Sequence, residues 1–138
     1  MKIRPFQRRD KAAVISLWSE CGLLAPQNDP GKDIARKMKI FPEGFLVGEA
    51  DGRIIATCMA GYEGHRGWIN YLAVSPTHRR QGVGRQILAT AEILLAAAGC
   101  PKINLQVRSS NTGVIAFYMA AGFAVDDVVS MGKRLVVD

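Results

Sequence analysis

The sequence has few of the residues that build disulfide-stapled or metal-stabilised folds. It contains three cysteines, Cys21, Cys58 and Cys100, and no two of them form a Cys-x-x-Cys pair. A disulfide framework needs an even set of cysteines, and a structural zinc site needs closely spaced Cys and His ligands. We therefore expect neither a disulfide framework nor a metal site.

A long hydrophobic run is also missing. The longest apolar stretch, Ile87 to Cys100, contains Glu92 and is too short to cross a bilayer. The first ten residues are charged where a signal peptide would be apolar. We expect a cytoplasmic protein with no membrane partner.

Acidic residues are outnumbered by basic ones. The 138 residues include 18 Lys and Arg against 12 Asp and Glu, which gives a net charge of +6. This balance favours a polyanionic partner, such as nucleic acid or a phosphorylated cofactor. The length and the 49% share of hydrophobic residues predict one compact domain over residues 1–138.

The hydrophobic pattern predicts a chain that mixes helices and strands. Helical spacing predicts helices over residues 10–21, 32–40, 84–98 and 111–121. Alternating apolar residues predict strands over 2–5, 45–50, 53–62, 68–74 and 101–107, with two more inside 123–137. The Asp51-Gly52 pair between two of these strands predicts a tight hairpin. A run of antiparallel strands followed by β-α-β crossovers predicts a mixed sheet with helices on both faces.

The most specific local feature is a basic, glycine-containing turn that precedes the 84–98 helix. It reads Arg79-Arg80-Gln81-Gly82-Val83-Gly84-Arg85. Backbone N–H groups at a helix start can bind phosphate oxygens, and glycines allow a close approach; the alternative is a solvated basic turn. No Gly-Lys-Ser/Thr follows, as a P-loop requires, and Ile87 stands where a dinucleotide fingerprint has its third glycine.

A second motif lies in the last helix and the turn after it. It consists of Asn111, Ala116, Tyr118, Gly122 and Phe123. Together the two motifs resemble the GNAT superfamily of acetyl-CoA-dependent N-acetyltransferases. Its cofactor motif, Gln/Arg-x-x-Gly-x-Gly/Ala, is met by Arg79, Gly82 and Gly84, and the element order matches along the whole chain. The run from Gly61 to Val74 is similar to that of small bacterial acetyltransferases of the YpeA type.

The resemblance implies a GNAT-like α/β (α+β) fold. Its sheet would be mixed and mostly antiparallel, with six to seven strands, helices on both faces, and a splay between the fourth and fifth strands. Acetyl-CoA would be the cosubstrate, with its pantetheine arm on the main chain of Leu72, Ala73 and Val74. The pyrophosphate would lie on the basic turn. The residues of the turn that the resemblance implies as cofactor contacts are Arg79, Arg80, Gln81, Gly82, Val83, Gly84 and Arg85. Asn111 and Tyr118 would contact the cofactor from the last helix.

The same resemblance implies direct acetyl transfer to a primary amine. Tyr118 is the implied general acid for the departing thiolate, although an aromatic at this spacing could also be a core residue. Asn111 could cap the last helix, bind the cofactor arm, or do both. Glu63 is the first candidate for the general base, directly or through water, ahead of His65 and Tyr71.

Two other functions stay open. An acyl-CoA sensor without turnover would keep the cofactor motif. A nucleic-acid-binding module would explain the charge, but such modules interleave aromatics with basic residues, whereas the arginines here adjoin glycines, so nucleic acid is not the expected partner. The acceptor could be a small-molecule or a peptide amine, and the C-terminal strands could pair in a homodimer.

Overall fold

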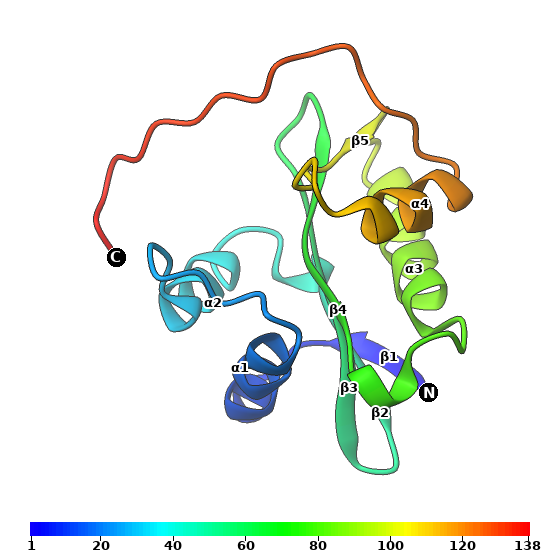
Figure 1. The fold of residues 1–138 in the computed structure, drawn as a ribbon. Helices are drawn as coiled ribbons and strands as arrows, with labels where there is room; N and C mark the ends of the chain where they lie inside the picture. Colours follow the sequence, from blue (N-terminus) through cyan, green and yellow to red (C-terminus); the bar gives the residue numbers. More distant parts are fainter. The chain divides into compact units, whose positions relative to one another are not determined.

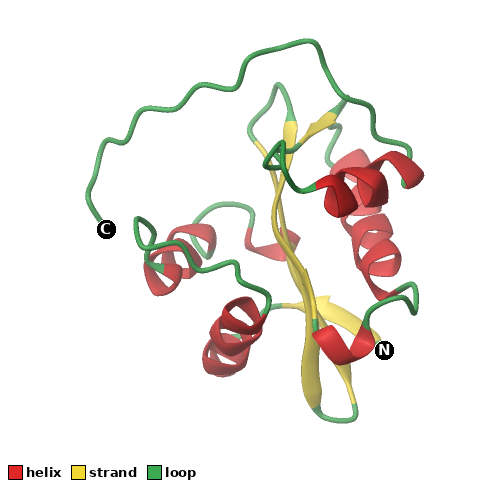
Figure 2. Ribbon diagram, in the orientation of Figure 1, coloured by secondary structure: helices red, strands yellow, loops and turns green.

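The computed structural model describes all 138 residues, in two compact units. The first contains Met1–Asn104 together with Asp138, and the second contains Leu105–Val137. The first unit holds strands β1 (Lys2–Pro5), β2 (Phe45–Ala50), β3 (Arg53–Tyr62), β4 (Gly67–Val74) and β5 (Ile103–Asn104), and helices α1 (Lys11–Glu20), α2 (Pro30–Lys37) and α3 (Val83–Ala97) (Figures 1 and 2). The second holds helix α4 (Thr112–Ala120).

The sheet is mixed and mostly antiparallel, as predicted. Its strand order is β1-β2-β3-β4-β5, and only the last pairing, β4 with β5, is parallel. That pairing joins Gly67 to Ile103 and Trp68 to Asn104 and goes no further. The rest of β4 therefore has a strand neighbour only on its β3 side.

The hairpin between β2 and β3 has the geometry that Asp51-Gly52 predicts. Asp51 has φ +51° and Gly52 has φ +73°, so both central residues are left-handed. Turns with two left-handed residues match the twist of the flanking strands, and Asp-Gly tolerates that backbone better than most pairs. The local sequence thus sets the register of this hairpin.

Helices cover both faces of the sheet in the first unit. Figure 1 shows α1 and α2 on one face and α3 on the other. Side chains alternate along each strand, so Phe45 and Val47 join the core beneath α1. The Phe45 ring stacks on Phe6 at a centroid distance of 4.4 Å. On the opposite face, α3 buries an apolar stripe that consists of Val83, Ile87, Leu88, Ala91 and Leu95.

A buried ion pair joins the first strand to the start of α1. Arg4 donates from Nη1 and Nη2 to the two carboxylate oxygens of Asp10, at 2.7 and 2.9 Å. Asp10 also accepts from the Gln7 N–H at 2.8 Å, and Arg4 Nε reaches Glu49 at 3.2 Å. Each charge is paired and hydrogen-bonded, which is the condition for stable burial of ionic groups.

The sheet has five strands, so the prediction of six to seven is wrong. Residues 123–137 form no strand, and the strand expected over 101–107 is confined to Ile103–Asn104. Alternating apolar residues become a strand only when their backbone finds a ladder partner. In the second unit, Gln106 donates to the Ser130 hydroxyl and Arg134 donates to the Val136 carbonyl, and neither bond is part of a strand ladder. Its apolar side chains are exposed, among them Val125, Val128, Val129, Met131, Leu135 and Val137.

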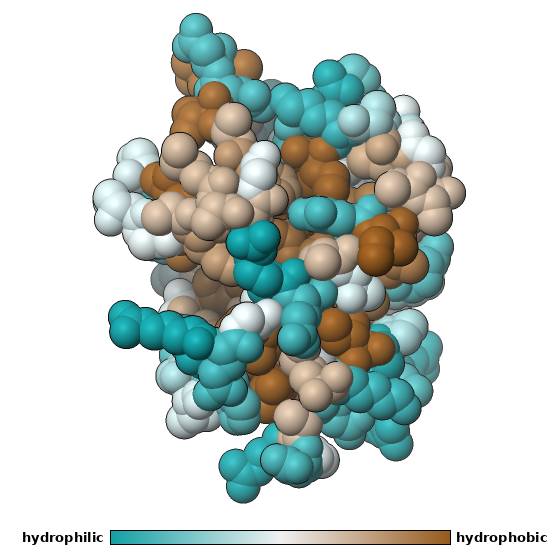
Figure 3. Space-filling model, turned by 90° about the vertical axis from the view of Figure 1, so that its right-hand side faces the viewer, coloured by the Kyte–Doolittle hydropathy of each residue, from teal (hydrophilic) through white to brown (hydrophobic).

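The surface is chemically mixed. Figure 3 shows hydrophobic residues in brown among hydrophilic residues in teal on one face of the molecule. No helix of the structure combines the length and the apolar character that a membrane span needs.

Candidate active site

The basic turn at the start of α3 has an open, left-handed backbone. Arg80 has φ +62° and Gly82 has φ +77°, and Gly82 is the N-cap of α3 without a capping side chain. A Cβ built on Gly82 would meet no atom within 4 Å. The first N–H groups of α3 have no intrahelical partner, and the helix dipole makes this end positive. The turn is therefore suited to bind an anion such as a phosphate.

The residues around this turn are mostly exposed and basic. Arg79, Arg80 and Arg85 are exposed, as is Gln81, whereas Val83 is buried and anchors the helix start to the core. Arg79 also donates from Nε to the Val74 carbonyl at 3.2 Å, and Cys21 Sγ approaches the same oxygen at 3.3 Å. A ligand group at the Val74 carbonyl would have to share it with Arg79 or displace that side chain.

The second half of β4 contains a β-bulge. Thr57 pairs with Ala73 and Met59 pairs with Asn70, so Tyr71 and Leu72 lie together opposite Cys58. Tyr71 has φ +50°, which is uncommon for a residue with a bulky side chain. Bulges of this kind re-aim backbone and side chains next to functional sites. This one overlaps, at Leu72, the segment whose main chain would contact the cofactor according to the family resemblance.

A chain of hydrogen bonds from α1 reaches the bulge. Trp18 Nε1 donates to Thr57 Oγ1 at 2.9 Å, and Thr57 Oγ1 donates to the Tyr71 carbonyl at 2.8 Å. Trp18 and Thr57 are fully buried. Two buried polar side chains thus satisfy each other and hold the backbone of Tyr71.

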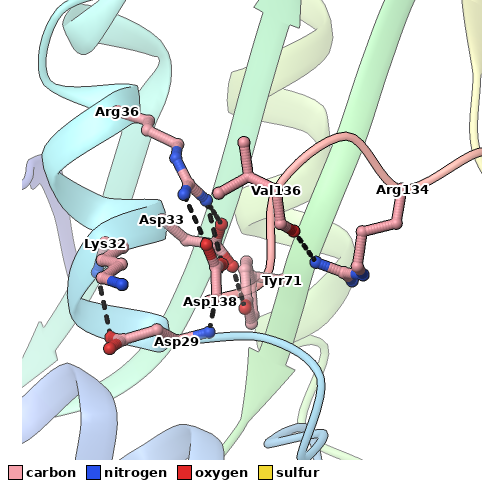
Figure 4. A network of polar contacts seen from close by, with 8 residues as sticks. All are labelled: Asp29, Lys32, Asp33, Arg36, Tyr71, Arg134, Val136 and Asp138. Atoms are coloured by element: carbon pink, nitrogen blue, oxygen red, sulfur yellow. Dashed lines mark hydrogen bonds and ion pairs between the residues drawn. The ribbon is translucent and has the colours of Figure 1, made fainter.

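The Tyr71 side chain is also held, by α1 and α2. Its ring stacks on Trp18 at a centroid distance of 3.8 Å, and its hydroxyl donates to Asp33 Oδ2 at 2.7 Å (Figure 4). Burial raises the pKa of Tyr71, and the hydrogen bond to the Asp33 carboxylate raises it further. The phenol therefore stays protonated at neutral pH, and its proton is directed at Asp33. Tyr71 is a poor general base in this arrangement.

Asp33 belongs to a larger polar network that Figure 4 shows. Arg36 donates to Asp138 at 2.6 and 3.1 Å and to Asp33 at 3.3 Å, and the Asp29 N–H donates to Asp138 at 3.4 Å. The hydrogen bond from Arg36 lowers the pKa of Asp138 to about 2. Arg36 and Asp138 stand 102 positions apart, so no local sequence signal could have indicated this pair.

Glu63 lies in the hairpin between β3 and β4. Its Oε1 accepts hydrogen bonds from the backbone N–H groups of His65, at 3.1 Å, and Arg66. The side chain is exposed, as is that of His65. From Gly67, the first residue of β4, to Tyr71 at the bulge, the strand covers roughly 13 Å at about 3.3 Å per residue. Val74, at the end of β4, thus contacts the basic turn through Arg79, with Leu72 and Ala73 preceding it in the strand, and Glu63 lies beyond the other end of β4.

Asn111 and Tyr118 belong to the second unit. Asn111 is the N-cap of α4, and its Oδ1 accepts from the Val114 N–H at 3.3 Å, so the capping role is present. Tyr118 is buried in α4, with edge-on ring contacts to Phe117 at 5.2 Å and Phe123 at 5.5 Å. These contacts orient the phenol ring within its own unit.

The three cysteines form no disulfide bond, and Cys58 is fully buried. Burial raises the pKa of Cys58 to about 12, so this thiol stays protonated and unreactive at neutral pH. Cys100 Sγ lies 3.3 Å from the Lys102 carbonyl, where it is a weak donor. All three cysteines are free thiols.

Comparisons with known proteins identify the family of this chain. The family model "Acetyltransferase (GNAT) family" matches residues 11–123. An acetyltransferase of Yersinia pestis is 46% identical over 138 residues, which cover 100% of this chain and 98% of the relative. A solved structure from Agrobacterium tumefaciens superposes with a TM-score of 0.81 at 18% identity and covers 97% of this chain and 100% of its own. An aminoglycoside N-acetyltransferase in complex with CoA superposes with a TM-score of 0.72 at 19% identity, covering 96% and 99%. The chain belongs to the GNAT family of acetyltransferases.

Proposed function

We propose that this protein is an acetyl-CoA-dependent N-acetyltransferase that moves the acetyl group directly from the thioester to a primary amine. The observation that carries the proposal is the open glycine turn at the start of α3, which follows β4 after a short 3-10 turn at Pro76–His78; the edge of β4 beyond Trp68 is unpaired. An extended, polyphosphorylated cofactor suits this pair of features. Both units would act as a single catalytic domain over residues 1–138, and the family match across residues 11–123, which includes parts of both, supports this.

The cofactor would be held mainly by backbone groups. The pyrophosphate binds the N–H groups from Gly82 to Gly84, with Arg79, Arg80 and Arg85 adding positive potential. The pantetheine arm lies along the open edge of β4 and exchanges hydrogen bonds with the main chain of Leu72, Ala73 and Val74, as an added strand would. Asn111 contributes its remaining polar groups from the start of α4.

The transfer needs an uncharged amine and a protonated leaving group. The amine nitrogen attacks the thioester carbonyl carbon, the C–N bond forms, and the C–S bond breaks to release CoA. Tyr118 donates a proton to the departing thiolate, and the second proton, which the nitrogen releases as the amide forms, restores the Tyr118 hydroxyl. The proton that the ammonium loses goes to Glu63 through water, because the hairpin position of Glu63 favours an indirect path over direct contact. No metal ion takes part in this scheme.

The acceptor is a small molecule or a peptide that carries a primary amine. A structural relative, the aminoglycoside N-acetyltransferase, acts on amines by its name, which supports this class of acceptor. Nucleic acid and membranes are not partners in this proposal. A cytoplasmic location and a homodimer formed through the C-terminal segment stay predictions.

A calorimetric titration of acetyl-CoA into the purified protein tests the cofactor, and thiol release with a panel of primary amines tests the reaction. We expect saturable binding, and turnover with at least one amine. Tyr118→Phe should keep the acetyl-CoA Kd within a few-fold and lower kcat sharply. Saturable binding without thiol release from any amine would favour the acyl-CoA sensor. Absence of acetyl-CoA binding would refute the proposal, and salt-dependent binding to DNA or RNA would then identify a nucleic-acid-binding module.

A further inference from the structure

We propose that Thr57 is a positioning residue for the thioester of acetyl-CoA. Its hydroxyl holds the Tyr71 carbonyl, and this turns the Leu72 N–H to the open edge of β4, where it donates to the thioester carbonyl oxygen. The inference rests on the proposed function, since it assigns a task to residues of the same site.

The direction of the Leu72 N–H follows from the planarity of the peptide bond. The Tyr71 carbonyl and the Leu72 N–H belong to one peptide unit, and the chain contains no cis peptide bond. In a trans peptide the C=O and N–H bonds point in opposite directions. The Tyr71 carbonyl points to Thr57, which lies on β3. The Leu72 N–H therefore points away from β3, to the side where the β5 pairing has already ended.

The hydrogen bond from Trp18 leaves the Tyr71 carbonyl as the acceptor for the Thr57 hydroxyl. An indole N–H is only a donor, so its bond to Thr57 Oγ1 occupies an acceptor site of that oxygen. The hydroxyl hydrogen is then left for the Tyr71 carbonyl, which is 2.8 Å away. Because Trp18 and Thr57 are fully buried, no water competes for these bonds. The two side chains together hold one peptide plane in one orientation.

The left-handed backbone of Tyr71 explains why such support is needed. A tyrosine at φ +50° has a higher backbone energy than a residue in a regular strand. The difference is comparable to the energy of one hydrogen bond. Without the bond from Thr57, the peptide between Tyr71 and Leu72 can rotate toward regular strand geometry. That rotation would take the Leu72 N–H away from the open edge.

A comparison of two ligands tests this without knowledge of the amine acceptor. Acetyl-CoA and CoA share the pyrophosphate and the pantetheine arm, but only acetyl-CoA has the thioester carbonyl. We expect the wild-type protein to bind acetyl-CoA about three- to ten-fold more tightly than CoA. This ratio of Kd values corresponds to the contribution of about one hydrogen bond. In Thr57→Val this preference should fall to roughly two-fold or less, with the CoA Kd within about two-fold of wild type.

Three further variants separate positioning from a loss of packing. Thr57→Ser keeps the hydroxyl and should restore the preference for acetyl-CoA. Leu95→Ala removes a buried side chain of α3 outside the hydrogen-bonded chain, so it should lower Tm and keep the preference. Trp18→Phe removes the indole N–H, keeps an aromatic ring, and should reduce the preference even if Thr57→Val does not fold.

The outcomes are distinct. A selective loss of acetyl-CoA affinity in Thr57→Val, restored in Thr57→Ser, supports the inference. An unchanged preference, a parallel loss of both ligands, or a wild-type protein that binds both equally overturns the inference and leaves the proposed function standing. A wild-type protein that binds neither ligand overturns the proposed function, and the inference with it.

Discussion

Two glycines at opposite ends of α3 offer a matched test of whether the turn before this helix binds the pyrophosphate. Gly82 precedes the helix with φ +77°, and Gly99 follows it with φ +88°. A Cβ at either position would meet no atom within 4 Å. Gly82→Ala and Gly99→Ala therefore introduce the same backbone strain and no clash, but only Gly82 lies in the turn predicted to bind the pyrophosphate.

The expected effect on stability is small and equal. An L-residue in the left-handed region costs about 1–2 kcal/mol, and the lower entropy of the unfolded alanine chain offsets part of this. A net loss of about 1 kcal/mol corresponds to a Tm decrease of about 3 °C for a domain of this length, at about 2.1 cal/mol/K per residue. Both variants should fold and unfold cooperatively.

The expected effect on ligand binding is unequal. In Gly82→Ala the new methyl group lies in the space through which a phosphate approaches the first N–H groups of α3. Loss of one hydrogen bond to a charged group costs about 1.5–3 kcal/mol, so the acetyl-CoA Kd should rise by at least about ten-fold. Gly99→Ala should keep the wild-type Kd. Calorimetric titration measures both values, and equal Kd values in the two variants would refute the assignment of this turn as the phosphate site.

Three further predictions concern other parts of the chain. Asp10→Ala should lower the free energy of unfolding by about 3 kcal/mol in a denaturant titration. The reason is that Arg4, whose side chain is only 10% exposed, loses its main partner. A loss below about 1 kcal/mol would contradict this account. The folded state lowers the pKa values of Asp10 and Asp138, so these ionised carboxylates stabilise the fold above about pH 4. This contribution is lost as the pH falls toward 2, so Tm should decrease between pH 5 and pH 2. The decrease should be smaller in Asp10→Asn. Glu63→Gln keeps the Oε1 acceptor of the hairpin and removes the basic group, so Tm should stay constant while kcat falls by about 10²-fold, and an unchanged kcat would remove Glu63 from the mechanism.

The features that could be predicted from the sequence depend on interactions among residues a few positions apart. The Asp51-Gly52 turn, the open turn before α3 and the cap of α4 by Asn111 are of this kind. Their geometry follows from the steric freedom of glycine and from side chains that reach their own backbone. The same locality explains why the motif from Arg79 to Gly84 could be interpreted before any fold was known.

In the C-terminal segment, the alternation of apolar residues is not sufficient to predict strands. Its apolar alternation predicts two strands, yet the structure has none over residues 123–137. A strand is defined by hydrogen bonds to a neighbour that can be distant in sequence, whereas alternation describes only one side of that pair. The prediction of the short strand β5 is incomplete for the same reason.

The network of hydrogen bonds around Tyr71 could be recognised only in the folded molecule. Trp18, Thr57 and Tyr71 come from three elements, and Asp33 and Asp138 from two more positions far along the chain. Each of these residues has an ordinary explanation in the linear sequence, as core aromatic, strand threonine or surface carboxylate. Their connection depends on sheet register, on the bulge opposite Cys58 and on the packing of α1 and α2 against one face. Short-range chemistry thus indicated the family and the turn that we propose as the phosphate site. The backbone conformation at Tyr71 and Leu72 depends instead on long-range contacts that a linear pattern does not encode.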